Sequence, residues 1–182
     1  SLEELSYNHT KKKDEMKEFL SAYFEPYYDV NLDQDPRVLF ISGRYEYHNK
    51  GVDILIDALS QLNEEDGDDF FVFIFVPSDT KGPKPEVLDN MSLYDELEDH
   101  VDSILPDIRR KILSSIAGDE NPIDEIKEEL ETGTLDSLRR NFHGKQGSPP
   151  VSAFDLNYPE DEILNGLWEA GLTNSEEDRV KV

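Results

Sequence analysis

The residues best suited to chemistry lie in one short segment, between a predicted strand at residues 37–42 and a predicted helix at residues 51–62. This segment holds two cations, Arg44 and Lys50, and the glycines Gly43 and Gly51 stand beside them. In open α/β sheets, ligands bind beyond the carboxyl ends of the strands, where Arg44 would lie. Lys50 would lie at a helix N-terminus, where free backbone N–H groups and the helix dipole favour anions. Gly43 and Gly51 would let the backbone come close to such a ligand.

Two fixed cations in an otherwise acidic chain suit a diphosphate. When a group is transferred from a nucleotide-sugar, negative charge builds on the leaving diphosphate, and Arg44 and Lys50 could stabilise that charge without a metal. The alternative is that both cations pair with the many nearby carboxylates, since Gly-Arg and Lys-Gly pairs are common in proteins.

Neighbouring side chains carry weaker hypotheses. His48 could touch a ligand, although an exposed loop histidine is the commoner case. Glu46 could act as an acid or base, but no second carboxylate is paired with it by spacing. Tyr45 and Tyr47 either stack on a ligand or simply pack the loop.

Charged residues elsewhere look structural. Two basic pairs are predicted to be salt-bridge partners rather than a phosphate site: Arg109, Arg110, Arg139 and Arg140. Lys11 to Lys13 are predicted to be a solvated helix start. The four histidines, which show no ligand spacing, are His9, His48, His100 and His143. Because the chain also lacks cysteine, which removes thiolate nucleophiles and Cys-ligated metals, we expect no metal site and no cofactor.

The chain is strongly acidic: its 182 residues include 42 Asp and Glu against 18 Lys and Arg, a formal net charge of −24. Such a charge argues against nucleic acid and anionic membranes as partners. With no apolar run long enough for a membrane span and no signal peptide at its start, we expect a cytoplasmic protein. The acidity indicates either a halophilic protein, whose self-repulsion is screened by high internal salt, or simply an acidic soluble one. The densest acidic run, residues 64–69, is predicted to be a solvated loop.

Hydrophobic periodicity predicts an α/β fold. Residues 11–24 place Met16, Phe19, Leu20 and Tyr23 on one helical face. The apolar runs at 37–42 and 70–76 predict buried parallel strands, joined by an amphipathic helix at 51–62. Together they form a β-α-β unit at about residues 37–76, with a right-handed crossover expected. Residues 77–85 are predicted to be loop.

The middle of the chain is predicted to be helical. Apolar residues recur in steps of three and four along one stripe: Leu93, Leu97, Val101, Ile104, Ile108, Ile112 and Ile116. This stripe is either core or an interface with another subunit. Pro106 predicts a kink or break in it, and Gly118 a stop. Asn121 and Pro122 predict a new helix, and Thr134 the cap of a further one.

The last part of the chain reads as a loop at 144–151 and a helix from Pro159 to Gly171, which carries Ile163, Leu167 and Trp168. The final residues 179–182 look like the start of a strand. A strand that stops after four residues suggests a cut polypeptide.

Three blocks, in order, resemble the animal and fungal glycogen synthases (glycosyltransferase family 3). Residues 37–63 contain the strand, G-R-Y-E-Y, N-K-G-x-D and a helix ending A-L-x-x-L-N, and residues 29–33 (DVNLD) also fit. Residues 144–151 (GKQGSPPV) resemble the family's R-Q-x-x-P-P-V segment. Residues 171–182 resemble its G-L-x-N-x-x-x-D-R-V-K-V segment. The similarity spans most of the chain, from about Met16 to Val182.

The resemblance implies two Rossmann-like domains with the active site in the cleft between them (the GT-B fold). It implies transfer of glucose from UDP-glucose to an α-1,4-glucan with retention of configuration and no metal. It assigns the donor's diphosphate to Arg44 and Lys50, which would be catalytic, with Gly43 and Gly51 beside them in the substrate site. The chain would then be a partial Rossmann-like domain (residues 1–90 and 151–182) with a mostly helical insertion (residues 91–150). In eukaryotic members that insertion contributes to subunit contacts, which implies a homo-oligomer.

Departures from the family pattern limit these expectations. The acceptor-binding domain, the paired glutamates and the arginine cluster for glucose 6-phosphate are not in this chain, so the fragment alone is expected to be inactive. Ile41-Ser42 stands where many members have I-A. Two rival hypotheses remain. One is a non-catalytic acidic helical module for interaction or oligomerisation. The other is a GT-B transferase with another nucleotide-sugar donor, such as ADP-glucose.

Overall fold

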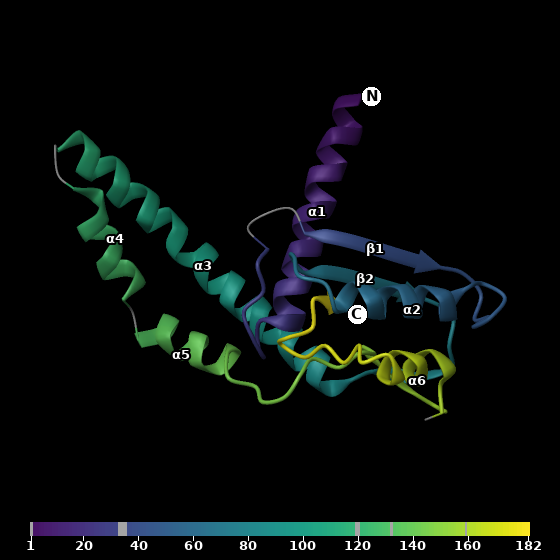
Figure 1. The fold of residues 1–182 in the computed structure, drawn as a ribbon. Coiled ribbons are helices and arrows are strands. Elements are labelled where there is room, and N and C mark those ends of the chain that lie inside the picture. Colours follow the sequence, from purple (N-terminus) through teal and green to yellow (C-terminus); the bar gives the residue numbers. More distant parts are fainter. Residues whose placement is uncertain (1, 33–35, 119–120, 132, 159) are drawn as a thin grey trace.

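The computed structural model describes residues 2–32, 36–118, 121–131, 133–158 and 160–182. In chain order the elements are α1 (Leu2–Phe24), β1 (Arg37–Ser42), α2 (Val52–Asn63), β2 (Phe70–Phe75), β3 (Thr80–Pro83), α3 (Pro85–Ala117), α4 (Pro122–Leu130), α5 (Gly133–Phe142), β4 (Phe154–Leu156), α6 (Glu162–Glu169) and β5 (Val180–Lys181). Figure 1 shows a body built around a sheet, from which α3, α4 and α5 extend as an arm. None of the helices within these ranges is both long and apolar enough to cross a membrane.

Three parallel strands form the central sheet, in the order β1-β2-β5. β1 and β2 pair along their whole length, from Arg37 opposite Phe70 to Ser42 opposite Phe75. β5 pairs with the start of β2, where Val180 lies opposite Phe70. Because α2 connects two parallel strands, the predicted β-α-β unit is confirmed, and so is a strand near the end of the chain.

Helices cover both faces of this sheet, as two successive residues of β2 show. The side chain of Phe71 packs with α1, and its ring centroid lies 5.5 Å from that of Phe24. Val72 packs on the opposite face, among the buried side chains of α2 and α6. This alternation follows from the two-residue period of a strand. The result is a three-layer α/β body, with the loop after β1 at one edge of the sheet.

The helix predicted at residues 11–24 is confirmed and is longer, since α1 begins at Leu2. Of its predicted apolar face, Leu20 and Tyr23 are buried and Met16 packs against the same cluster. Phe19 is 37% exposed, and its ring lies 6.0 Å from that of Phe73 on β2. The face is therefore the one that the spacing predicts.

The long helix α3 runs through Pro106 without interruption. Of the two outcomes predicted at this proline, a kink or a break, the break is therefore wrong. One missing N–H removes a single backbone hydrogen bond from a helix of 33 residues, and the rest of the ladder remains. The helix also packs against α1, α4 and α5, which adds tertiary support. It ends at Gly118, as predicted, where the N–H of Gly118 donates to Ser114 O at 2.9 Å.

The shorter helices of the arm begin close to their predicted signals. Asn121 caps α4, because its side-chain oxygen accepts a hydrogen bond from the N–H of Ile123 at 3.1 Å. Thr134 does not cap α5, since that helix has already begun at Gly133. An ion pair of 2.8 Å between Lys111 and Glu129 joins α3 to α4.

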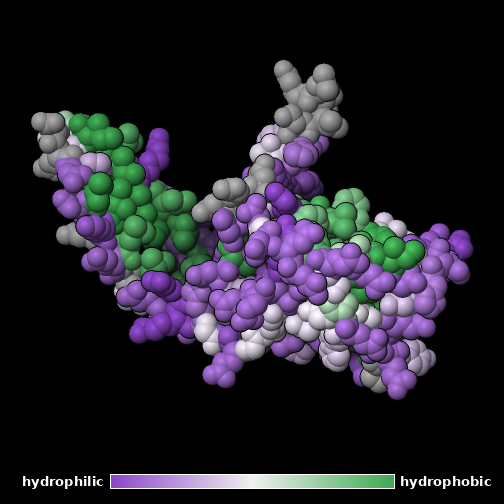
Figure 2. Space-filling model, viewed as in Figure 1, coloured by the Kyte–Doolittle hydropathy of each residue, from purple (hydrophilic) through white to green (hydrophobic). Residues whose placement is uncertain are grey.

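The apolar stripe of α3 is only partly covered. Leu97, Ile104, Ile108 and Ile112 are half-buried, whereas Ile116 at the end of the helix is 65% exposed. Other apolar side chains on the arm are also exposed: Val101, Leu105, Leu113, Ile123 and Leu130. Figure 2 shows this apolar surface running along the arm.

A two-stranded ribbon closes the base of the arm, and the sequence does not predict it. β3 lies within the segment expected to be loop and pairs antiparallel with β4, so that Pro83 lies opposite Phe154. Its residues, T-K-G-P, show no apolar alternation, and its partner strand is distant in the sequence. The chain enters α3 directly after β3, at Pro85, and returns to the body through β4. The division of the chain at residues 90 and 150 stays a prediction.

Helix α6 is shorter than the predicted segment and begins after Asp161, whose carboxylate accepts hydrogen bonds from the N–H groups of Ile163 and Leu164, both at 3.0 Å. Ile163 and Leu167 are buried against the body, as their spacing indicates. Trp168 is 63% exposed, because only one side of this short helix meets the body. The predicted start at Pro159 lies outside the described residues.

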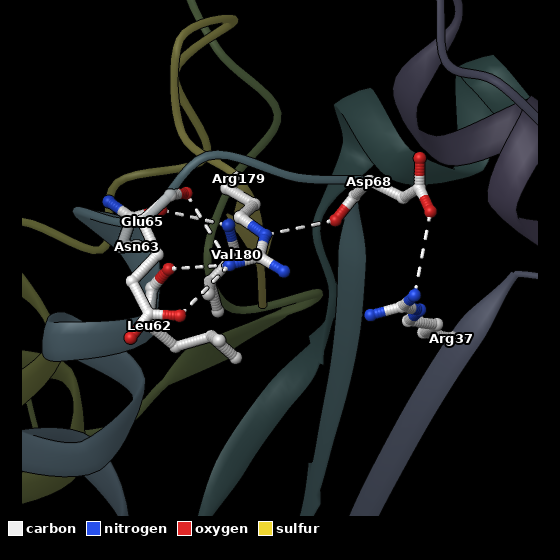
Figure 3. A network of polar contacts seen from close by, with 7 residues as sticks. All are labelled: Arg37, Leu62, Asn63, Glu65, Asp68, Arg179 and Val180. Atoms are coloured by element: carbon white, nitrogen blue, oxygen red, sulfur yellow. Dashed lines mark hydrogen bonds and ion pairs between the residues drawn. The ribbon is translucent and has the colours of Figure 1, made fainter.

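The side chain of Arg179 ties the end of α2 to the acidic loop (Figure 3). Its guanidinium donates to the carbonyl oxygens of Leu62 at 3.3 Å, Glu65 at 3.4 Å and Asp68 at 3.1 Å. Beside it, Asn63 Oδ1 accepts the N–H of Val180 at 2.8 Å and so joins α2 to β5. The acidic run at residues 64–69 is thus a loop, as predicted, but its backbone is held by a cation whose side chain is only 11% exposed.

Candidate functional site

The loop that carries the predicted cations begins at the carboxyl edge of the sheet. The N–H of Gly43 donates to Phe75 O at 3.2 Å, which extends the β1–β2 ladder by one residue. A side chain at Gly43 would meet no other atom within 4 Å, so this position faces open space. Parallel sheets bind ligands beyond this edge, and the structure therefore places the loop where the sequence predicts.

The loop is a compact turn closed by its own backbone. The N–H of Lys50 donates to Glu46 O and that of Gly51 to His48 O, both at 3.1 Å. Gly51 has a φ of 68° and is the residue before α2. A residue with a Cβ is strained in this left-handed conformation, so the glycine is needed for the turn itself.

The first N–H groups of α2 already have partners, which corrects one expectation. Those of Val52 and Asp53 donate to Tyr47 O at 3.0 and 3.4 Å. The N–H of Ile54 donates to the Asp53 carboxylate at 2.9 Å. An anion here would therefore meet the helix dipole and the side chains of the loop, rather than these backbone N–H groups.

The side chains of Arg44 and Lys50 are exposed, and neither forms an ion pair or hydrogen bond with any residue of the described ranges. The alternative in which nearby carboxylates neutralise them thus has no support among those residues. Three arginines elsewhere do have acidic partners: Arg37 with Asp68 at 3.6 Å, Arg110 with Asp107 at 2.7 Å and Arg179 with Glu65 at 3.6 Å. The cations of the loop remain available for an anionic ligand.

His48 and Asp53 form a pair on the surface of the loop. The Nδ1 atom of His48 lies 2.8 Å from Asp53 Oδ2. This contact, together with the N–H of Ile54, holds the pKa of the Asp53 carboxyl below its ordinary value. His48 is exposed, as expected, and its ring meets that of Tyr47 edge-on at 5.0 Å. The pair connects the middle of the loop to the first turn of α2.

The two tyrosines pack the loop rather than project from it. Tyr45 and Tyr47 both lie against the cluster formed by α2, α6 and the sheet. The hydroxyl of Tyr45 accepts the N–H of Ile163 at 3.4 Å and lies close to the carboxylate of Asp161. Burial, followed by this carboxylate, raises the pKa of Tyr45. The packing alternative for the tyrosines is therefore the one with support in the structure.

Other charged groups do not join this loop. Arg139, Arg140 and His143 line an open cavity of about 610 Å³ at the end of α5, together with Asp29 and Asp136. In the parts of the chain that the structure describes, no group of three or more His, Asp or Glu side chains could hold a metal ion. Sequence reasoning missed Asp161, whose contact with Tyr45 joins positions 116 residues apart and leaves no local pattern.

The fold and the site define an α/β protein with an exposed cationic loop at the carboxyl edge of a parallel sheet. The family model for glycogen synthase matches residues 1–182, and the chain belongs to this family. It is 31% identical to the glycogen [starch] synthase of Neurospora crassa, over 100% of this chain and 27% of that protein. The liver glycogen [starch] synthase of Homo sapiens is 29% identical over 96% of this chain and 26% of that protein. The enzyme of Dictyostelium discoideum is 31% identical over 100% of this chain and 21% of that protein.

The chain spans about a quarter of the length of the curated relatives that it matches. The match thus covers one region of those enzymes.

Proposed function

We propose that the protein containing this chain is a retaining glucosyltransferase that transfers glucose from UDP-glucose to an α-1,4-glucan. The chain contributes part of a Rossmann-like domain to a GT-B enzyme, with its cationic loop facing the cleft between two domains. The observation that carries the proposal is the pair Arg44 and Lys50, which lie exposed and without ionic partners among the described residues, at the ligand-binding edge of the sheet.

The loop's part in this reaction is electrostatic. As the bond between glucose and the donor breaks, negative charge grows on the diphosphate oxygens. The guanidinium of Arg44 can form two parallel hydrogen bonds to such oxygens, and Lys50 adds a compact positive charge. The N-terminus of α2 lies beside them and favours the same charge. These groups supply charge where it develops, so they would lower the barrier to departure of the diphosphate.

The test is replacement of each cation in the full-length enzyme. Arg44→Ala and Lys50→Ala should each lower kcat/KM for glucose transfer to glycogen by about 100-fold or more, the usual effect of removing a group that stabilises transition-state charge. Both variants should also bind UDP more weakly in calorimetry. Arg109→Ala, which removes an exposed arginine of the helical arm, is the matched control and should change neither value. Full activity of Arg44→Ala and Lys50→Ala would contradict the catalytic role of the loop and favour the hypothesis of a non-catalytic interaction module.

The same assay decides the donor. UDP-glucose and ADP-glucose carry the same diphosphate, so both would meet Arg44 and Lys50 alike. We propose UDP-glucose from the family match. Transfer with a higher kcat/KM from ADP-glucose would show that the base is read differently in this protein.

The exposed apolar side chains of the arm favour a second role, in contacts between subunits. Leu113 and Ile116 on α3 and Ile123 on α4 are each more than half exposed, a cost in water that a partner surface would remove. We propose that a second copy of the protein covers this surface. Leu113→Glu together with Ile116→Glu should reduce the mass of the full-length enzyme in sedimentation, with Leu88→Glu near the base of α3 as the control. An unchanged mass would exclude this surface as the interface.

A further inference from the structure

We propose that helix α6 positions the cationic loop, with Tyr45 and Tyr47 as the contacts and Asp161 and Gly166 as their partners. The inference rests on the proposed function, because the position of the cations affects activity only if they bind the donor. It concerns residues that touch neither substrate nor reacting atoms, and it assigns a role to a helix far from the loop in sequence.

The loop carries exposed side chains at both ends and inward-packing tyrosines between them. Arg44 is exposed, Tyr45 packs inward, and Tyr47 packs inward again. Lys50 then follows as an exposed residue whose backbone is held by Glu46. Both cations therefore stand on a backbone that is anchored between them.

Tyr45 supplies the first anchor. Its hydroxyl accepts the N–H of Ile163 at 3.4 Å and lies close to the carboxylate of Asp161. Asp161 also caps α6, and the N–H of Ile163 is shared between its carboxylate and the tyrosine next to Arg44. A shift of α6 would pull on the residue adjacent to the first cation.

Tyr47 supplies the second anchor, through both its backbone carbonyl and its side-chain hydroxyl. Its carbonyl oxygen accepts the N–H groups at the start of α2, while its hydroxyl lies directly against Gly166 of α6. A Cβ at Gly166 would overlap this hydroxyl and would lie 3.2 Å from the ring atom Cζ and 3.3 Å from Ile56 Cδ1. Gly166 does not have a positive φ, so its lack of a side chain serves close approach and not backbone conformation.

This geometry permits a sharp experiment in the full-length enzyme. Gly166→Ala introduces a residue that favours helix, so α6 should not be weakened. It should push the ring of Tyr47 outward and lower kcat/KM by about tenfold or more, since small misplacements of positioning groups are costly. Binding of UDP should weaken in parallel, while the thermal unfolding temperature stays the same. Asn165→Ala, on the exposed side of the same helix, is the control and should match the parent in all three measurements.

A second substitution tests the route of the effect. Tyr47→Phe removes the hydroxyl that the new Cβ would overlap, so Gly166→Ala combined with Tyr47→Phe should recover kcat/KM to within about threefold of the parent. A double variant no better than Gly166→Ala alone would overturn the inference, because the effect would then not pass through Tyr47. Parental kcat/KM in Gly166→Ala itself would overturn it as well.

Two further outcomes separate this inference from the proposed function. If Gly166→Ala does not fold, Tyr45→Phe takes its place and should lower kcat/KM several-fold, since it removes only the bonds to α6; parental activity would refute the role of α6. If Arg44→Ala keeps parental activity, the proposed function fails, whatever the α6 variants do. If Arg44→Ala is inactive while Gly166→Ala and Tyr45→Phe both keep parental activity, the positioning role of α6 is refuted and the proposed function is not.

Discussion

Asp178 is predicted to hold the turn before β5 in place, and Asp178→Asn is the perturbation that tests this. Asp178 is 8% exposed. Its Oδ1 atom accepts a hydrogen bond from Asn63 Nδ2 at 2.9 Å. Its Oδ2 atom accepts three more, from the N–H and hydroxyl of Thr173, both at 3.2 Å, and from the N–H of Ser175 at 2.8 Å. The substitution keeps the shape of the side chain and changes only its charge and one acceptor.

The magnitude follows from the geometry. The new amide oxygen would best occupy the Oδ2 position, where three donors meet, which leaves its NH2 group facing the NH2 group of Asn63. Asn63 cannot turn to compensate, because its oxygen accepts the N–H of Val180. One buried donor pair left unsatisfied costs about 1–3 kcal/mol, and the loss of charge from the remaining bonds adds about 1 kcal/mol. We expect a total of about 2–4 kcal/mol.

The effect should also depend on pH. Burial is the largest single influence on Asp178 and opposes its ionisation, but the hydrogen bonds from Asn63, Ser175 and Thr173 together outweigh it and lower the pKa. A carboxyl with a folded-state pKa below its unfolded value of about 3.9 stabilises the fold above that pH. This stability is lost as the pH falls through the folded-state pKa. The Asn variant has no such charge, so its local stability should not show this loss.

Hydrogen exchange in the full-length enzyme is the suitable assay, because it reports the stability of this turn separately from other domains. A loss of about 2–4 kcal/mol corresponds to exchange faster by roughly 30- to 1,000-fold at the amides of Thr173, Ser175 and Val180. Asp57→Asn, an exposed carboxylate on α2, is the control. Less than tenfold faster exchange at residues 173–180, with the control unchanged, would show that the carboxylate is not what holds the turn.

Three shorter predictions concern the core, the acidic loop and the surface charge. Phe71 is 1% exposed between α1 and the sheet, so Phe71→Ala should lower the free energy of unfolding by about 3–5 kcal/mol in denaturant titrations, and a loss below about 1 kcal/mol would contradict the packing. Arg179→Lys cannot reproduce the planar fork that meets three carbonyl oxygens, so proteolysis within residues 64–69 should accelerate; unchanged cleavage would argue that the loop is held by other contacts. Because the chain has a net charge of −24, added salt should weaken its self-repulsion, so the unfolding temperature should rise as KCl increases to about 1 M, where the screening length is about 3 Å. A fall in the unfolding temperature would contradict the hypothesis of a halophilic protein.

The elements that the sequence predicted are those with a local signal, such as an apolar face or a capping residue. Helical periodicity predicted α2, the apolar run at residues 70–76 predicted β2, and the signals at Asn121 and Pro122 predicted the start of α4. β3 was missed because its four residues are ordered by pairing with β4, a non-local contact with no local signature. The break predicted as one outcome at Pro106 does not occur, because the packing of α3 on its neighbours adds to the hydrogen bonds that remain.

The sequence predicted which residues form the candidate site, but only part of their contacts. Residue types and the rule for parallel sheets placed Arg44 and Lys50 at the correct edge. Free N–H groups at α2 were the natural expectation for a helix after a glycine. The carbonyl of Tyr47 takes two of them, and only the three-dimensional path of the loop shows this. The contacts of Tyr45 and Tyr47 with α6 were invisible for the same reason.

An acidic chain has a particular difficulty in keeping two cations available, since carboxylates compete with any anionic ligand. Two carboxylates near the loop have other partners, Asp53 and Asp161. Asp53 is held by His48 and by the N–H of Ile54, and Asp161 is held by the N–H groups at the start of α6. The bond between His48 and Asp53 also joins the loop to the first turn of α2. The contacts that hold the loop thus leave Arg44 and Lys50 exposed, as the proposed binding of a diphosphate requires.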